Sequence, residues 1–223
     1  MKKQHKIWEN EHAKHSMLPS IGAMKPSEGV IKFIDFIKQR VGFNSAVIDI
    51  GAGKGRNSIY LAEERFEVFA VDFIQTAINS IDRLGYKNIH THVFDLTEKW
   101  PFDNDFFDLA VDCFSSIDID TSQGRINYRN ELFRTLKNGG YALIMVVSND
   151  DELESTFNHG AEKNSTIWPT GKFQKNYDEN ELKDFYKGFK ILKLELQEKP
   201  AFKLGQNYTA RNFWLVLQKN EKS

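Results

Sequence analysis

A glycine-rich turn after an apolar run near residue 50 limits what this chain can fold into. The run covers residues 47–50, interrupted by one acid at Asp49, and Gly51, Gly53 and Gly55 follow it in alternate positions. Glycines let the backbone take conformations that a Cβ would forbid, and they let a ligand come close to the main chain. A helix that begins next would direct its free N–H groups at that ligand. The pattern predicts a strand, a turn and a helix with a ligand at the turn.

A second apolar run ends in an acidic residue. Residues 68–71 are apolar, and Asp72 follows them, 21 residues after Gly51. An acid about 20 residues beyond such a turn can accept hydrogen bonds from the hydroxyls of a ribose. Taken alone, Asp72 could instead cap a helix. The turn and the acid together predict a site for an adenosine-like cofactor, because two independent signals agree.

Two common nucleotide motifs do not fit this turn. The nicotinamide fingerprint needs a small residue three positions after the second glycine, where this chain has Arg56. The phosphate-binding P-loop needs Ser or Thr after Gly-Lys, whereas Gly55 follows Lys54. What remains is an acid, Asp49, before three alternate glycines. An acid at this point suits a cationic ammonium group better than a pyrophosphate.

This pattern resembles the first motif of the class I S-adenosylmethionine-dependent methyltransferases, and the resemblance implies S-adenosylmethionine as the cofactor. In that family the turn holds the methionine part, the acid matching Asp72 binds the ribose, and the residue matching Phe73 lies beside the adenine. Asp95 matches the acid that accepts from the adenine amino group. The cofactor-binding residues that the resemblance implies are Asp49, Gly51, Ala52, Gly53, Arg56, Asn57, Asp72, Phe73, Asp95, Leu96 and Asp112.

The resemblance covers roughly residues 44–147. Residues 100–108 resemble the family's approach to its fourth strand, and residues 133–143 resemble its helix, turn and fifth strand. Within the class, residues 55–58 most resemble the tellurite-resistance methyltransferases, which act on small molecules. The implied topology is seven strands in the order 3-2-1-4-5-7-6, and residues 211–218 fit its antiparallel last strand.

The apolar pattern by itself predicts an α/β fold, because strands and helices alternate along the chain. With the resemblance, we expect a Rossmann-like, doubly wound, seven-stranded sheet with helices on both faces. Ser27 is expected to cap the first helix of this core, Gly42 to end it, and Asp178 to cap the last helix. Strands are expected at 46–50, 67–71, 89–93, 107–112, 141–147, 189–197 and 211–218, and helices at 27–41, 56–65, 74–84, 125–137 and 179–187.

Length and charge narrow the class of protein. The 223 residues are expected to form one domain. Its parts would be an N-terminal lid at 1–26, a cofactor-binding core at 27–147, a substrate-side insertion at 148–177, and a C-terminal helix and strands at 178–219. The net charge of −1 disfavours a nucleic-acid partner, which needs clustered cations. No apolar run approaches a membrane span, so we expect no membrane partner and a cytoplasmic location.

Motif matching names no catalytic residue, since methyl transfer mainly needs the acceptor to be aligned. The weak candidates are His12 and His15 in the N-terminal lid and Asp112 at the end of the fourth strand. Trp8, His12 and His15 would share one face of a helix. The alternative is that these rings only pack the lid, or that Asp112 only binds its own loop. A metal site is not expected, because Cys113 is the single cysteine and the histidines lack a ligand spacing.

The sequence therefore predicts an S-adenosylmethionine-dependent methyltransferase acting on a small-molecule acceptor. Alternatives are methylation of RNA or of a protein side chain, and a protein that binds the cofactor without catalysis. The pattern does not specify the acceptor atom or the oligomeric state.

Overall fold

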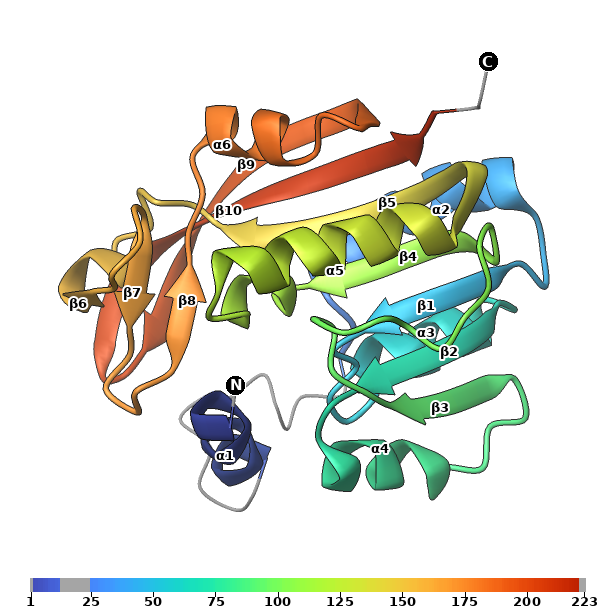
Figure 1. Ribbon diagram of the computed structural model, residues 1–223, viewed down its shortest axis with the longest axis horizontal. Coiled ribbons are helices and arrows are strands. Elements are labelled where there is room, and N and C mark those ends of the chain that lie inside the picture. Colours follow the sequence, from blue (N-terminus) through green and yellow to red (C-terminus); the bar gives the residue numbers. More distant parts are fainter. Residues whose placement is uncertain (1, 13–24, 221–223) are drawn as a thin grey trace.

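The computed structural model describes residues 2–12 and 25–220. Its centre is a seven-stranded sheet in the order β3-β2-β1-β4-β5-β10-β9, which confirms the expected topology (Figure 1). Strands β1 to β5 pair in parallel, and β10 pairs antiparallel with both β5 and β9. The strands are β1 (Ala46–Ile50), β2 (Glu67–Asp72), β3 (Ile89–Val93), β4 (Phe107–Cys113), β5 (Leu136–Val147), β9 (Phe189–Lys203) and β10 (Gln206–Lys219).

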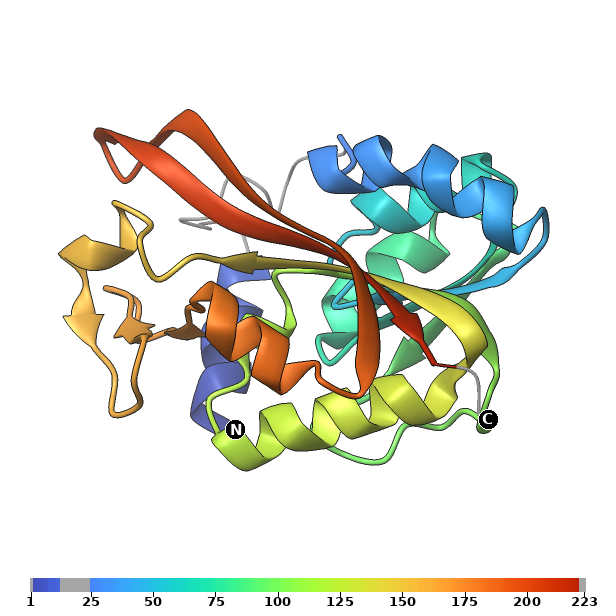
Figure 2. The same cartoon turned by 90° about the horizontal axis from the view of Figure 1, so that it is seen from above.

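Helices cover both faces of this sheet, as predicted. One face carries α2, α3 and α4, and the opposite face carries α5 and α6 (Figure 2). This division follows from right-handed crossovers: β2 and β3 are added on one side of β1, and β4 and β5 on the other, so their connecting helices lie on opposite faces. The helices are α1 (Lys2–His12), α2 (Glu28–Val41), α3 (Arg56–Glu63), α4 (Gln75–Asp82), α5 (Ser122–Thr135) and α6 (Glu179–Phe185).

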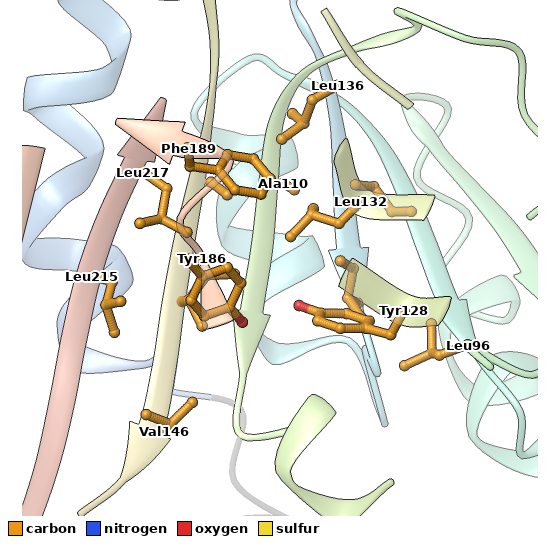
Figure 3. Packing of buried hydrophobic residues seen from close by; sticks show 14 of the residues in the cluster. Leu96, Ala110, Tyr128, Leu132, Leu136, Val146, Tyr186, Phe189, Leu215 and Leu217 are labelled. Atoms are coloured by element: carbon orange, nitrogen blue, oxygen red, sulfur yellow. The ribbon is translucent and has the colours of Figure 1, made fainter. Parts of the chain in front are cut away.

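Two apolar clusters lie on the two faces of the sheet. On one face, Val47 of β1 packs with Phe33 of α2 and Leu61 of α3. On the other, Tyr128 and Leu132 of α5 pack with strand residues, together with Tyr186 just after α6 (Figure 3). Neighbouring residues of a strand point to opposite faces, so a strand buried on both faces needs a continuous apolar run. This explains why the parallel strands were recognisable in the sequence.

The helix ends agree with the sequence at two positions and differ at a third. Asp178 caps α6 in a reciprocal capping box with Glu181. Gly42 follows α2 with a φ of 77°, as expected of a glycine stop. Ser27 precedes α2, but its hydroxyl makes no capping bond, and its backbone N–H donates to Asn57 Oδ1 at 2.9 Å. The prediction of a Ser27 side-chain cap is therefore wrong.

Three parts extend beyond the main sheet and the helices that cover it. Helix α1 stands apart from the sheet. Residues 148–177 form a short three-stranded sheet of β6 (Asn158–His159), β7 (Ser165–Ile167) and β8 (Phe173–Lys175). The hairpin of β9 and β10 continues well past the main sheet, and its far end lies beside this small sheet (Figure 1). Within the described ranges, no helix is both long and apolar enough to cross a membrane.

Candidate active site

A cavity of about 730 Å³ lies at the carboxyl ends of β1, β2 and β4. Its volume is within the range usual for small-molecule sites, and ligands of open α/β sheets bind at these strand ends. Helix α1, the short helix η2 (Ser116–Asp118), the small sheet and the extended hairpin complete the wall. The cavity therefore joins the predicted cofactor site to the N-terminal lid and to the substrate-side insertion.

The glycine turn approaches the loop after β4 and helix α4 too closely for side chains. Gly51 has a φ of 64°, and a Cβ built there would lie 2.1 Å from the Ser115 Oγ atom. Gly55 has a φ of 89°, and its Cβ would lie 2.9 Å from Ile81 Cγ1. Only glycine takes these conformations without strain and without these clashes. The turn therefore presents bare backbone to the cavity.

Asp72 joins this turn to the next strand. Its Oδ2 atom accepts the Gly53 N–H at 2.9 Å, and its Oδ1 atom accepts the Ile74 N–H at 2.9 Å. Burial raises the pKa of this carboxyl, while the two backbone donors act in the opposite direction. A carboxylate can accept about four hydrogen bonds, so it can still receive the hydroxyls of a ribose. Asp72 lines the cavity, which fits the predicted cofactor.

The predicted adenine side also lines the cavity. Phe73 lies against His5 of α1, with the ring centres 5.2 Å apart in an edge-to-face arrangement. Asp95 and Leu96 follow β3 and face the same space. The Asp95 Oδ1 atom is held by the backbone and hydroxyl of Thr97, at 2.9 and 2.7 Å. This end combines an aromatic ring with a fixed carboxylate, which suits a purine with an exocyclic amino group.

The side chains of three residues of the predicted cofactor set bond to neighbouring elements and do not line the cavity. The Asp49 carboxylate turns toward α3 and accepts the Ser58 hydroxyl at 2.5 Å. The Asn57 side chain binds the backbone N–H that precedes α2. Asp112 turns toward α5, where its Oδ2 atom accepts the Tyr128 hydroxyl at 2.7 Å. The orientation of Asp49 and Asp112 follows from their strands, because successive side chains of a strand point to opposite faces of the sheet and these two point to the helix layers.

Asp112 holds the loop after β4. Its Oδ1 atom accepts the Ser115 N–H at 2.8 Å, and its Oδ2 atom accepts the Ser116 N–H at 3.2 Å. The residue is fully buried, and burial raises the pKa of its carboxyl. Of the two readings left open by the sequence, the geometry favours the loop contact. We therefore assign Asp112 to holding this loop and not to catalysis.

Helix α1 covers the glycine turn with its aromatic face. Trp8 and His12 lie one turn apart with ring centres separated by 6.2 Å, and both line the cavity. His12 Cε1 is 3.6 Å from the position that a Cβ on Gly53 would occupy. Burial lowers the pKa of His12, although the Asp72 carboxylate opposes this shift. His15 lies outside the described residues.

The part of the cavity away from the turn holds charged residues that the sequence analysis did not identify. Lys172 and Trp168 come from the inserted segment, Asp118 from η2, and Lys203 from the extended hairpin. Lys172 Nζ lies 3.3 Å from Asp118 Oδ1 and 4.2 Å from the centre of the Trp168 ring. Burial raises the pKa of Asp118 to about 6, against the attraction of Lys172. His159, by contrast, is exposed on β6.

No group of three His, Cys, Asp or Glu side chains is placed to hold a metal ion in the described part of the chain.

Comparison with known proteins agrees with this geometry. Residues 47–140 match the family model described as a methyltransferase domain. Two curated relatives from strains of Haemophilus influenzae, both described as probable S-adenosyl-L-methionine-dependent methyltransferase TehB, are 26% identical over 149 residues. That alignment covers 66% of this chain and 46% of each relative. The chain thus spans about half the length of the curated relatives it matches.

Solved structures show the same fold. An S-adenosylmethionine-dependent methyltransferase from Methanosarcina mazei has a TM-score of 0.69 at 20% identity, over 84% of this chain and 98% of that one. The structure of TehB from H. influenzae has a TM-score of 0.61 at 22% identity, over 85% and 62%. The 1,6-didemethyltoxoflavin-N1-methyltransferase of Burkholderia thailandensis, solved with bound 1,6-didemethyltoxoflavin and S-adenosylhomocysteine, has a TM-score of 0.64 at 17% identity, over 87% and 79%.

Proposed function

We propose that the chain is a class I S-adenosylmethionine-dependent methyltransferase similar to TehB, and that it methylates a small molecule held in the cavity at the ends of β1, β2 and β4. The observation that carries this proposal is that one cavity joins two chemically different halves. The first half contains the glycine turn and Asp72. The second half contains Trp168, Lys172 and Lys203.

The first half fits the cofactor through groups of this chain. The turn offers backbone at close range, and the Asp72 carboxylate can accept from the ribose hydroxyls. Phe73 and Asp95 stand at the adenine end. Among the predicted cofactor contacts, we retain Gly51, Ala52, Gly53, Arg56, Asp72, Phe73, Asp95 and Leu96, all of which line the cavity. The turn and the neighbouring loop are held on the side away from the cavity by hydrogen bonds of Asp49, Asn57 and Asp112.

The reaction needs little from the protein beyond alignment. When bound, S-adenosylmethionine supplies a methyl group on a positively charged sulfur that leaves readily. The protein's task is to hold the acceptor atom within about 3–3.5 Å of that methyl group and in line with the bond that breaks. Trp8 and Trp168 provide apolar walls for this purpose. Helix α1 covers the turn and excludes water, and we assign His12 to this enclosure rather than to proton transfer.

A small acceptor suits this cavity better than a macromolecule does. Helix α1, the inserted segment and the extended hairpin all contribute to its wall, which suits a ligand small enough to lie inside. The net charge of −1 also disfavours binding to RNA phosphates, which needs clustered cations. The cytoplasmic location expected from the sequence stays a prediction.

Binding and turnover can be tested on the same preparation. S-Adenosylmethionine and S-adenosylhomocysteine would be titrated by calorimetry, and methyl transfer would then be screened by mass spectrometry with thiols, phenols, amines and chalcogen anions. We expect micromolar binding of both compounds and methylation of at least one small acceptor. Binding without turnover on any acceptor would favour the non-catalytic alternative, and failure of both compounds to bind would contradict the proposal.

A further inference from the structure

The second half of the cavity contains a lysine whose charge has no carboxylate partner. Lys172 is paired with Asp118 at 3.3 Å, and Lys199 is paired with Glu28 at 2.7 Å. Lys203 Nζ, in contrast, has neither a hydrogen bond nor an ion pair with any residue that the structure describes, and lies 4.4 Å from the centre of the Trp168 ring. A lysine that lines a cavity and rests on an indole is available to a ligand.

The carboxylates near Lys203 are already held by other donors. The Asp151 oxygens accept the N–H groups of Leu153 and Arg211 at 3.0 and 2.8 Å. Glu154 Oε2 accepts the Thr166 hydroxyl at 2.5 Å. The Trp168 indole N–H is buried and has no acceptor among the described residues. At this end of the cavity, Lys203 and the Trp168 indole are therefore donors without an acceptor, whereas Asp151 and Glu154 accept hydrogen bonds and Asp118 is ion-paired with Lys172.

From this arrangement we infer that Lys203 binds a carboxylate group on the methyl acceptor, so that the substrate is a small organic monoanion with an apolar body. The apolar body would lie along Trp168, Trp8 and Leu153, which line the same half of the cavity. The inference rests on the proposed function, since it identifies the class of acceptor for that site.

The surrounding carboxylates limit the number of negative charges that the ligand can carry. Asp118, Asp151 and Glu154 line the cavity near Lys203, and each would repel a second negative charge. A phosphate monoester carries between one and two charges at neutral pH. A single carboxylate matches the one unpaired lysine better than such a group does.

Matched pairs of compounds test the inference. The wild-type protein would be titrated by calorimetry with 4-hydroxybenzoate, cinnamate and hexanoate, each beside its primary amide, and with phenyl phosphate. The titrations would be done with and without saturating S-adenosylhomocysteine. A charge-assisted hydrogen bond predicts that at least one carboxylate binds about tenfold or more tightly than its amide.

Variants on one strand assign this preference to Lys203. Lys203→Met should reduce the carboxylate-to-amide ratio to near one, and Lys203→Arg should largely retain it because the charge remains. Lys190→Met is the control, since Lys190 is exposed on β9 and lies 13 residues away on that strand. Circular dichroism would show that each variant is folded.

The pH dependence is a second readout that a purely structural lysine would not give. Burial and the neighbouring Lys172 lower the pKa of Lys203 to about 8, while Glu154, Asp151 and Asp118 act in the opposite direction. Carboxylate affinity should therefore fall above pH 8 in the wild type, whereas amide affinity should not change.

Three results would overturn the inference: no carboxylate preferred over its amide, tighter binding of phenyl phosphate, or an unchanged preference in Lys203→Met. The proposed function fails separately, through loss of S-adenosylhomocysteine binding, because carboxylate binding is also measured without it.

Discussion

At the scale of single residues, Asp72 carries the cofactor assignment. It lines the cavity, and its two oxygens already accept the N–H groups of Gly53 and Ile74. We expect Asp72→Asn to weaken S-adenosylhomocysteine binding by roughly 10- to 100-fold, because a charged acceptor becomes a neutral amide. Calorimetry measures this directly. Asp35→Asn, an exposed change on α2, is the control and should leave the affinity unaltered.

The buried pair of Tyr128 and Asp112 makes a prediction about stability. Tyr128→Phe removes the hydroxyl that donates to the fully buried carboxylate at 2.7 Å. The free energy of unfolding should fall by about 1–3 kcal/mol, measured by urea denaturation. Tyr86→Phe removes a hydroxyl bond of 3.1 Å to Glu63 between exposed side chains, and its effect should stay within about 0.5 kcal/mol. Equal effects of the two changes would contradict this account of Asp112.

At the scale of elements, α1 is predicted to close the cofactor site. It contributes Gln4, His5, Trp8 and His12 to the cavity wall. Asn10 is exposed on this helix, and Asn10→Pro would break it by removing a backbone donor and crowding the preceding turn. We expect S-adenosylhomocysteine affinity to fall about tenfold or more, while the thermal midpoint changes little. Asn10→Ala keeps the helix and should bind normally, so an equal loss in both variants would contradict the prediction.

The sequence predicted the elements whose apolar residues form continuous or periodic patterns. The five parallel strands and the order of the sheet belong to this group, and so does the Asp178 cap. The continuation of β9 and β10 past residue 197 was not predicted, because this part is largely exposed and has no apolar alternation. Its tight turn has φ values of 51° at Leu204 and 79° at Gly205. Gly205 was therefore the signal that could have revealed the hairpin.

In the site, too, only the residues that belong to a local sequence motif could be predicted. The glycine turn and Asp72 are close in sequence to the strands that position them, so a motif could identify them. Lys172 and Lys203 come from the inserted segment and the hairpin, which meet only in the folded chain. The orientation of Asp49 and Asp112 toward the helix layers likewise depends on where each strand ends.

At the scale of the whole molecule, buried carboxyls are predicted to make stability depend on pH. Burial raises the pKa of Asp49 to about 7 and that of Asp118 to about 6, above the usual value of 3.8. The folded protein then binds more protons than the unfolded chain between about pH 4 and 7, so the free energy of unfolding falls as pH rises through this range. Urea denaturation at pH 5, 6 and 7 measures the slope.

Asp49→Asn isolates the contribution of one of these groups. The amide can still accept the Ser58 hydroxyl but does not titrate. We expect the slope between pH 5 and 7 to become less negative by about 1 kcal/mol per pH unit, which is the effect of one proton. Asp35→Asn should keep the wild-type slope. An unchanged slope in Asp49→Asn would contradict the raised pKa of Asp49.

The two halves of one cavity are the central feature of this protein. The most direct test is a calorimetric titration of the full chain with S-adenosylhomocysteine, with NAD as the comparison ligand. The account predicts one site per chain, a micromolar dissociation constant for S-adenosylhomocysteine, and no measurable binding of NAD. Absence of S-adenosylhomocysteine binding, or tighter binding of NAD, would contradict it.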